Sequence, residues 1–194
     1  MPPTPPADSP QLPPLRLAAG HGPSLAVEIE HAAPAGLARC LNCRTCSGGC
    51  PFYPAMDYGP HGIMRLIQFG QRDEVLASNT IWLCVACHTC TSACPMSIDV
   101  AAVMDTLRHL ALAEGVAVAE PGILDFHREV LRSIEHHGRT HKLEIMLRYK
   151  VRQGGWLADM DKGLAMLTRR KLNLIPNEIR RPAELAPLFQ KTWR

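Results

Sequence analysis

The sequence predicts a mainly α-helical protein, and three observations carry this prediction. Apolar residues recur at helical spacing in several segments after residue 60. Residues that begin and end helices flank these segments, as Pro121 and Gly138 do for one of them. The alternation typical of strands is weak and confined to SLAVEIE at residues 24–30, which fits either a short strand or the start of a helix.

Each expected helix follows from apolar spacing together with a residue that can begin or end it. Ile63 and Ile67 fall on one side of a helix that starts near Pro60 or His61 and stops at Gly70. The further expected helices are a short one capped by Asp73, a second short one capped by Asn79 or Thr80, one from Ser97 or Asp99 to Gly115, one from Pro121 to Gly138, one around residues 143–149 and a last amphipathic one over residues 160–172.

The chain is expected to have three parts. Residues 1–20 form a disordered, polyproline-like tail, because seven prolines within residues 1–15 prevent both helix and sheet. Residues 21–118 form a helical domain that holds every cysteine of the chain. Residues 119–194 form a C-terminal helical extension that ends in an extended docking tail with three more prolines.

The net charge of +3 hides an asymmetry along the chain. Residues 1–126 carry 6 basic and 11 acidic side chains, whereas residues 127–194 carry 15 basic and 7 acidic ones. A basic C-terminal part indicates either a solvated helical face or a surface that docks onto an acidic partner, and we favour the first. No nucleic-acid-binding motif accompanies it, and Trp156 and Trp193 are isolated, so we expect no nucleic-acid partner.

The chain is expected to lie in the cytoplasm and not within a membrane. Its first residues, MPPTPPADSP, lack the basic start and the apolar stretch of an export signal. No apolar run approaches the roughly 18 residues of a membrane-spanning helix. In a reducing compartment, cysteines at fixed spacing are metal ligands more often than disulfide partners.

The cysteines form two groups with the same spacing, C-x2-C-x2-C-x3-C-P. The first group is Cys40, Cys43, Cys46 and Cys50, followed by Pro51; the second is Cys84, Cys87, Cys90 and Cys94, followed by Pro95. A cubane 4Fe–4S cluster needs one thiolate for each of four irons. Three cysteines at two-residue gaps let a short loop wrap one corner of a cluster, with backbone N–H groups turned towards the sulfur atoms. The doubled run therefore predicts two 4Fe–4S clusters.

The last cysteine of each run is expected to bind the cluster of the other run. It lies too close in sequence to reach the cluster of its own loop, and the proline after it opens a helix that points away. In two-cluster ferredoxins the cysteine at this position ligates the other cluster. We therefore assign cluster 1 to Cys40, Cys43, Cys46 and Cys94, and cluster 2 to Cys84, Cys87, Cys90 and Cys50.

Residues inside the loops suggest further roles. Gly48 and Gly49 are expected to give the first loop conformational freedom near its cluster. Arg44 and His88 occupy matching positions between the second and third cysteines of each run. They either tune the cluster potentials through charge or hydrogen bonds, or face solvent or a partner.

Other cofactors explain the sequence less well. Cys84, Cys87 and His88 spell a haem-attachment signal, but haem would require export and would leave Cys90 and Cys94 without a role. Zinc sites use pairs of C-x2-C and not triplets. Three histidines could form a separate metal site, but an exposed helix end explains them better; they are His136, His137 and His141.

The two runs, separated by a helical linker over residues 51–83, resemble the α-helical ferredoxin domain of succinate and fumarate oxidoreductases. CLNCRTCSGGCP, IWLCVACHTCTSACP and KLNLIPNEIRR at residues 171–181 resemble the C subunit of heterodisulfide reductase, over roughly residues 35–185. The resemblance implies an α-helical ferredoxin domain with two 4Fe–4S clusters. It also implies an electron relay between the family's flavin- and cluster-bearing A subunit and its catalytic B subunit, whose CCG motifs hold the clusters that reduce a disulfide.

We therefore interpret the chain as the electron-transfer subunit of a heterodisulfide-reductase-type complex. No cysteine lies outside the two runs, so chemistry on a disulfide or sulfur compound must take place on a partner and no residue here is catalytic. An alternative is the iron–sulfur subunit of a quinone-linked dehydrogenase of the succinate or glycerol-phosphate type. A zinc-stabilised module that binds nucleic acid is a third and weaker interpretation.

Overall fold

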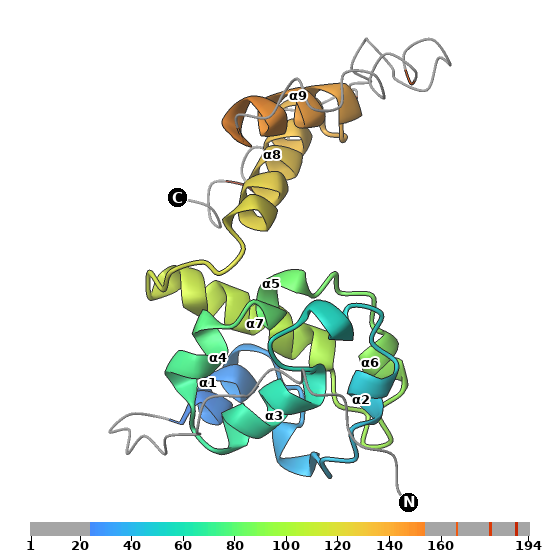
Figure 1. Ribbon diagram of the computed structural model, residues 1–194, viewed down its shortest axis with the longest axis vertical. Helices are drawn as coiled ribbons and strands as arrows, with labels where there is room; N and C mark the ends of the chain where they lie inside the picture. The colour runs from blue at the N-terminus through green and yellow to red at the C-terminus, as the bar shows by residue number, and fades with distance from the viewer. Residues whose placement is uncertain (1–23, 154–165, 167–178, 180–188, 190–194) are drawn as a thin grey trace, which may run out of the picture. The chain divides into compact units, whose positions relative to one another are not determined.

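A computed structural model describes residues 24–153 together with the single residues 166, 179 and 189 (Figure 1). Within these residues all regular secondary structure is helical, which confirms the mainly α prediction. The described residues belong to two compact units, one within Met1–Ala117 and one within Val118–Arg194. The predicted tail over residues 1–20 lies outside the described residues, as does the predicted helix over residues 160–172 apart from Met166.

The first unit contains seven α-helices and two short 3-10 turns among its described residues. In chain order they are α1 (Leu25–Ala32), η1 (Leu37–Arg39), α2 (Thr45–Gly48), η2 (Tyr53–Ala55), α3 (Pro60–Gln68), α4 (Arg72–Ala77), α5 (Thr80–Leu83), α6 (Thr89–Ser92) and α7 (Val100–Ala113). The long helices α3 and α7 end close to the predicted glycines. The short helices α2 and α6 lie within the cysteine runs, where no helix was predicted.

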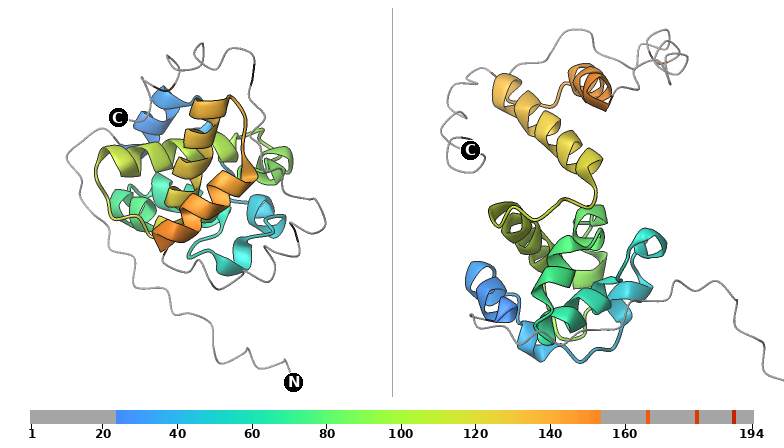
Figure 2. Two further views of the ribbon diagram at one scale, coloured as in Figure 1. Left: turned by 90° about the horizontal axis from the view of Figure 1, so that it is seen from above. Right: turned by 60° about the vertical axis from the view of Figure 1, so that its left-hand side comes forward.

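Helix α7 forms the centre of the first unit. It contacts α1, α4, α5 and α6 (Figures 1 and 2). Val103 and Leu107 on its inner face have no exposed surface, and neither has Ile63 on α3. Asp99 caps the helix as predicted, because its Oδ1 accepts a hydrogen bond from the N–H of Ala102 at 3.1 Å. The apolar spacing read from the sequence therefore identifies the residues of this core.

Local details differ from the sequence-based expectations. Residues 24–30 contribute to helix α1 and not to a strand, with Leu25 and Ile29 buried. Helix α4 begins after Gln71, so Asp73 lies in its first turn, where a carboxylate is favoured by the helix dipole. Asn79 precedes α5 as expected, but its side chain does not cap that helix. The side chain accepts a hydrogen bond from the N–H of Asp57 and donates one to the carbonyl of Ala55 in η2.

The described part of the second unit is a pair of helices that pack against each other, α8 (Pro121–His137) and α9 (Lys142–Gln153), with α9 lying across α8 (Figure 2). Gly138 ends α8 with a left-handed backbone, φ 69°, which matches its predicted role. At the open end of the pair, Arg152 of α9 lies 3.3 Å from Asp125 of α8. None of the helices in the described part of the chain is long and apolar enough to cross a membrane.

Replacing Leu107 by Ala tests the position of the core. Leu107 is fully buried, so Leu107→Ala should lower the free energy of unfolding by about 2–5 kcal/mol through lost burial and the cavity that remains. The measurement is chemical denaturation followed by circular dichroism under oxygen-free conditions. Val27→Ala is the control, because Val27 is 59% exposed and should change stability by less than about 0.5 kcal/mol. Equal effects of the two substitutions would contradict the assignment of α7 as the core helix.

Candidate iron–sulfur sites

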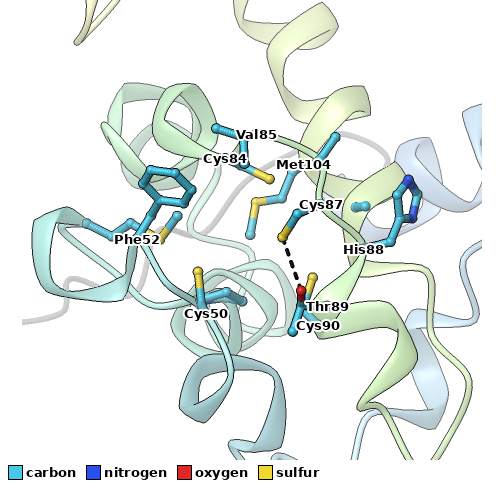
Figure 3. Close-up of a pocket in the computed structure, with 13 residues that line it drawn as sticks. Cys50, Phe52, Cys84, Val85, Cys87, His88, Thr89, Cys90 and Met104 are labelled. Atoms are coloured by element: carbon cyan, nitrogen blue, oxygen red, sulfur yellow. Dashed lines mark hydrogen bonds between the residues drawn. The ribbon is translucent and has the colours of Figure 1, made fainter.

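The structure gathers the cysteines around two cavities, and each cavity combines three cysteines of one run with the last cysteine of the other. The first cavity is lined by Cys40, Cys43, Cys46 and Cys94. The second is lined by Cys84, Cys87, Cys90 and Cys50, whose sulfur atoms surround a common space (Figure 3). The empty volumes are ≈ 370 and ≈ 400 Å³, part of each being open to solvent. These are the sets predicted from the spacing, and their assignment as cluster ligands stays a prediction.

The two cysteine loops share an uncommon backbone conformation. Asn42 and Ala86, which precede the second cysteine of each run, have φ values of 57° and 51°. Arg44 and His88, which follow that cysteine, have φ values of 64° and 58°. Left-handed backbone costs a residue with a side chain about 1–2 kcal/mol, so four such residues at matching positions indicate a loop shape that serves a function.

The glycines of the first loop do not supply this conformation. Gly49 has φ −95°, and neither Gly48 nor Gly49 is among the residues with positive φ. A Cβ atom at Gly48 would meet no other atom within 4 Å. The expected conformational freedom is therefore not used at these glycines, and the tight turns fall on non-glycine residues.

A threonine hydroxyl lies close to the sulfur of the second cysteine of each run, which is exposed. The Sγ of Cys43 lies 3.2 Å from Oγ1 of Thr45, and the Sγ of Cys87 lies 3.4 Å from Oγ1 of Thr89. The hydroxyl of the threonine, followed by its amide N–H, lowers the pKa of each of these two thiols. The neutral thiol of Cys87 donates to the Thr89 hydroxyl, whereas a thiolate can only accept. The amide N–H groups of the threonines are donors to sulfur, as the spacing predicted, and such donors favour the thiolate that iron requires.

The third cysteine of each run lies deeper than the second. Burial, and after it the thiol of Cys90, raises the pKa of Cys46 to about 11. Burial, and then the thiol of Cys84, also raises the pKa of Cys90. The effect of Cys90 on Cys46 means that the two cavities are neighbours, which agrees with the contact between α2 and α6.

A hydroxyl group after the third cysteine connects each loop to the start of a long helix. The N–H of His61 donates to Oγ of Ser47 at 3.0 Å, and the N–H of Ala101 donates to Oγ1 of Thr91 at 3.3 Å. Each donor is the second residue of its helix, so each hydroxyl satisfies an N–H that the helix itself cannot. Burial and then Arg44 lower the pKa of His61, which favours its neutral form, and Oγ of Ser47 shares a hydrogen bond with its Nδ1 at 2.8 Å.

A methionine from a long helix forms an apolar wall of each cavity. Met64 is the fifth residue of α3 and lines the first cavity, and Met104 is the fifth residue of α7 and lines the second. Both methionines are 1% exposed. Four cysteines, amide donors and an apolar wall are the surroundings that a 4Fe–4S cluster needs, so the residues present fit this group.

The same cysteines do not converge on a single point. Within the described residues, no three His, Cys, Asp or Glu side chains lie close enough together to hold one metal ion. A cubane binds each thiolate to a different iron atom and spreads them over its corners, so this spacing is compatible with a cluster.

Arg44 and His88 lie at the rims of the cavities. Both are exposed, and each lines the cavity of its own loop. Nδ1 of His88 lies 3.9 Å from Oδ1 of Asp99, an ion pair only when the imidazole is protonated. These positions leave room for both of the predicted roles, tuning of a cluster and contact with a partner.

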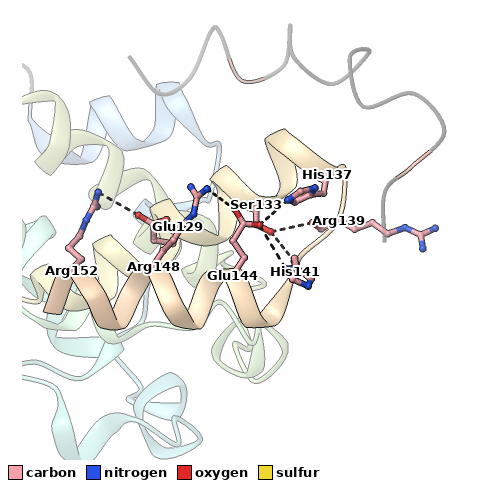
Figure 4. A network of polar contacts seen from close by, with 8 residues as sticks. All are labelled: Glu129, Ser133, His137, Arg139, His141, Glu144, Arg148 and Arg152. Carbon is pink, nitrogen blue, oxygen red and sulfur yellow. Dashed lines mark hydrogen bonds and ion pairs between the residues drawn. The ribbon is translucent and has the colours of Figure 1, made fainter. Parts of the chain in front are cut away.

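Two of the three histidines at the end of α8 belong to a polar network between α8 and α9 (Figure 4). Nε2 of His137 lies 2.9 Å from Oε2 of Glu144, and Arg148 pairs with the other carboxylate oxygen at 2.9 Å. His141 donates its N–H to the hydroxyl of Ser133 at 2.8 Å. The side chains of His137 and His141 are 19% and 12% exposed, so the expected exposed helix end describes only His136.

The sequence-based reasoning missed the polar residues that support the cysteines. The signal was available, because Thr45 and Thr89 occupy matching places when the two runs are aligned, and so do Ser47 and Thr91. It also missed Arg108, which contacts the backbone beside Cys84 and has no marker in the local sequence.

Comparisons with known proteins agree with this geometry. A family model described as a 4Fe-4S dicluster domain matches residues 39–99. Over 76 residues the chain is 37% identical to the iron-sulfur C subunit of CoB–CoM heterodisulfide reductase from Methanopyrus kandleri, a match that covers 39% of this chain and 40% of that protein.

Two further relatives are matched over longer segments. The chain is 35% identical over 147 residues to the C subunit of Ferredoxin:CoB-CoM heterodisulfide reductase from Methanosarcina acetivorans, with 74% of this chain and 54% of that protein covered. It is 32% identical over 118 residues to the protein of the same name from Methanosarcina mazei, with 61% and 69% covered. The chain thus spans about half the length of the first two relatives and more than two thirds of the third.

Ser47→Ala tests the hydroxyl that joins the first loop to α3. The substitution removes the acceptor of the His61 N–H at a buried position, so it should destabilise the protein by about 1–2 kcal/mol. The measurement is the denaturation midpoint of the cluster-loaded protein, together with the rate at which it loses iron to a chelator. Ser92→Ala, at an exposed position at the end of α6, is the matched control. The proposed cap is wrong if both variants unfold like the parent protein.

Proposed function

This chain belongs to the family of heterodisulfide reductase C subunits, and we propose that it relays electrons through two 4Fe–4S clusters inside a complex of this type. It is an iron–sulfur electron-transfer subunit of an oxidoreductase complex. We further propose that it binds two clusters with separate sets of cysteine ligands, and that it lies between two other subunits. Its neighbours would be the flavin-bearing A subunit and the catalytic B subunit, which would act on a disulfide or another sulfur compound.

The observation that carries the proposal is the exchange of cysteines between the two cavities. Cys94 lies in the wall of the cavity formed by the first run, and Cys50 lies in the wall of the cavity formed by the second. This arrangement supports ligation of one cluster by Cys40, Cys43, Cys46 and Cys94, and of the other by Cys84, Cys87, Cys90 and Cys50. When bound, each cluster takes up and releases one electron.

The residues of this chain would hold the clusters, shield them and keep them close together. The threonine hydroxyls beside Cys43 and Cys87 would donate to the ligating sulfurs, and the buried methionines would keep water from one side of each cluster. Because α2 contacts α6, the two cavities are neighbours, and clusters bound in them would lie side by side.

The substrate reaction would lie on a partner. All eight cysteines line the two cavities, so none is left for exchange with a disulfide. The role left for this chain is to connect an electron donor to the site of the reaction.

The proposed partners can be identified by oxygen-free affinity purification from the native host. We expect two proteins to co-purify with the tagged chain, one that contains flavin and one that carries CCG motifs. The chain itself should contain about eight iron and eight sulfide per molecule. Recovery of a membrane-anchored, quinone-reactive partner in their place would favour the dehydrogenase alternative. A preparation that contained zinc and no iron would contradict the iron–sulfur assignment.

If the last cysteine of each run ligates the cluster of the other run, single cysteine substitutions should fall into two pairs that affect the same cluster. Cys94→Ser should change the electron paramagnetic resonance signal of the cluster that Cys43→Ser also changes. Cys50→Ser should change the signal that Cys87→Ser changes. The reason is that each pair would ligate one cluster from two different runs.

The four variants are compared after reduction with dithionite in the absence of oxygen. Ser47→Ala serves as a control for a change beside a ligand that leaves every thiolate in place. If Cys94→Ser instead alters the same signal as Cys87→Ser, each run binds its own cluster and the proposed exchange is wrong.

A further inference from the structure

The two halves of the first unit repeat one another, and the repeat extends into the long helices. Counted from the first residue of each, Ile63 and Val103 occupy the fourth position of α3 and α7, and both are fully buried. The cavity-lining methionines occupy the fifth. The repeat breaks at the ninth position, which is Gln68 in α3 and Arg108 in α7.

Both ninth residues contact the loop that holds the first cysteines of their own half. Gln68 accepts a hydrogen bond from the amide of Asn42 at 3.2 Å and is exposed. Arg108 donates from its guanidinium to the carbonyls of Ile81 and Cys84. The side chain of Arg108 is only 12% exposed. A neutral, exposed contact in the first half thus corresponds to a charged, largely buried contact in the second.

The contact with Cys84 fixes the backbone at a predicted ligand of cluster 2. A trans peptide group directs its N–H opposite to its C=O, so the N–H of Val85 points away from Arg108. Val85 lines the second cavity, whereas Arg108 does not. Arg108 therefore holds one peptide group at the edge of the cavity and also brings a permanent positive charge close to it.

Other charges near the two cavities do not cancel this difference. Asp105 lies 3.8 Å from Arg108, but its side chain is 59% exposed, so water and salt screen it more effectively than the guanidinium. At the other cavity the positive group at the rim is Arg44, which is exposed. His88 faces Asp99, which offsets its charge when it is protonated. The largely buried charge at the second cavity is Arg108.

We propose that Arg108 makes cluster 2 the higher-potential cluster, so that the first electron to enter this chain resides beside Cys84. Reduction adds one negative charge to a cluster, and a nearby positive charge in a medium of low dielectric constant stabilises the reduced form. Arg108 is a positioning residue, because it acts through the backbone and through its field without touching the cluster. The inference rests on the proposed function, since it requires both clusters to be bound.

The test is a redox titration of the cluster-loaded protein monitored by electron paramagnetic resonance, with Cys43→Ser and Cys87→Ser used to assign the signals. Arg108→Gln should shift the reduction equilibrium of cluster 2 about tenfold towards the oxidised form, which is ~59 mV for a one-electron couple. Cluster 1 should not shift. Arg108→Lys, which keeps the charge, should restore most of the potential. Arg65→Gln is the matched control, because Arg65 is an exposed arginine of α3 stacked on Phe69, the residue after the helix.

A second variant separates charge from folding. Asp105→Asn leaves Arg108 in place and removes the exposed negative charge beside it, so it should shift cluster 2 about twofold towards the reduced form. This measurement decides the question if Arg108→Gln loses its clusters.

Three outcomes would overturn the inference while leaving the proposed function intact. They are unchanged potentials in both Arg108→Gln and Asp105→Asn, equal shifts of the two clusters, or a shift confined to the lower-potential cluster. A purely structural role predicts that Lys fails to restore the potential. A wild-type protein without about eight iron atoms would instead contradict the proposed function itself.

Discussion

The architecture of the first unit depends on one constraint: each cysteine cavity is completed by a cysteine from the other run. The last cysteine of each run lies in the wall of the opposite cavity and not in that of its own loop. Cys50 and Cys94 can each reach the opposite cavity only if α2 and α6 lie side by side. The linker between the runs must then fold back on itself, and it does so as three helices that pack against one another or against α7. The core of the unit is thus arranged around the exchange of two side chains.

This constraint also accounts for the strained backbone of the loops. Four residues adopt left-handed conformations although none is glycine, and an alanine is among them. At about 1–2 kcal/mol each, such residues are retained only where the surrounding structure requires them. Metal–thiolate bonds can supply the compensating energy, because in metalloproteins the binding free energy of the metal contributes directly to folding. A bound cluster would therefore supply much of the stability of the loops, whereas the core helices derive theirs from apolar packing.

The sequence predicted the elements whose signals are local, and the structure adds those that depend on distant parts of the chain. The doubled cysteine spacing also predicted which cysteines would share a cavity, because in two-cluster ferredoxins the last cysteine of such a run ligates the other cluster. The caps at Asp99 and Gly138 were predicted because their signals lie in the neighbouring residues.

Tertiary packing decided the conformation of residues 24–30, for which the sequence allowed either a strand or a helix. Leu25 and Ile29 lie four residues apart, which places both on one face of a helix, and both are buried in the structure. Gly48 and Gly49 suggested flexibility by composition alone, and the turns fell elsewhere. Nothing near Arg108 in the sequence indicates that it reaches back to the carbonyl of Cys84.

A duplicated scaffold creates a problem for directed electron transfer, because two identical sites would have equal potentials and an electron would have no preferred place. The support of the sulfurs is nearly the same in the two halves: a threonine beside the middle cysteine, a hydroxyl at the start of the long helix and a methionine behind the cavity. Any difference in potential must therefore come from positions where the repeat fails. Among those positions, the ones with a basic side chain in at least one half are the loop residues Arg44 and His88 and the ninth residues Gln68 and Arg108. Charges at the rim are screened by water, whereas a guanidinium that is 12% exposed is not, so the asymmetry that persists at physiological salt is the one carried by the interior of the fold.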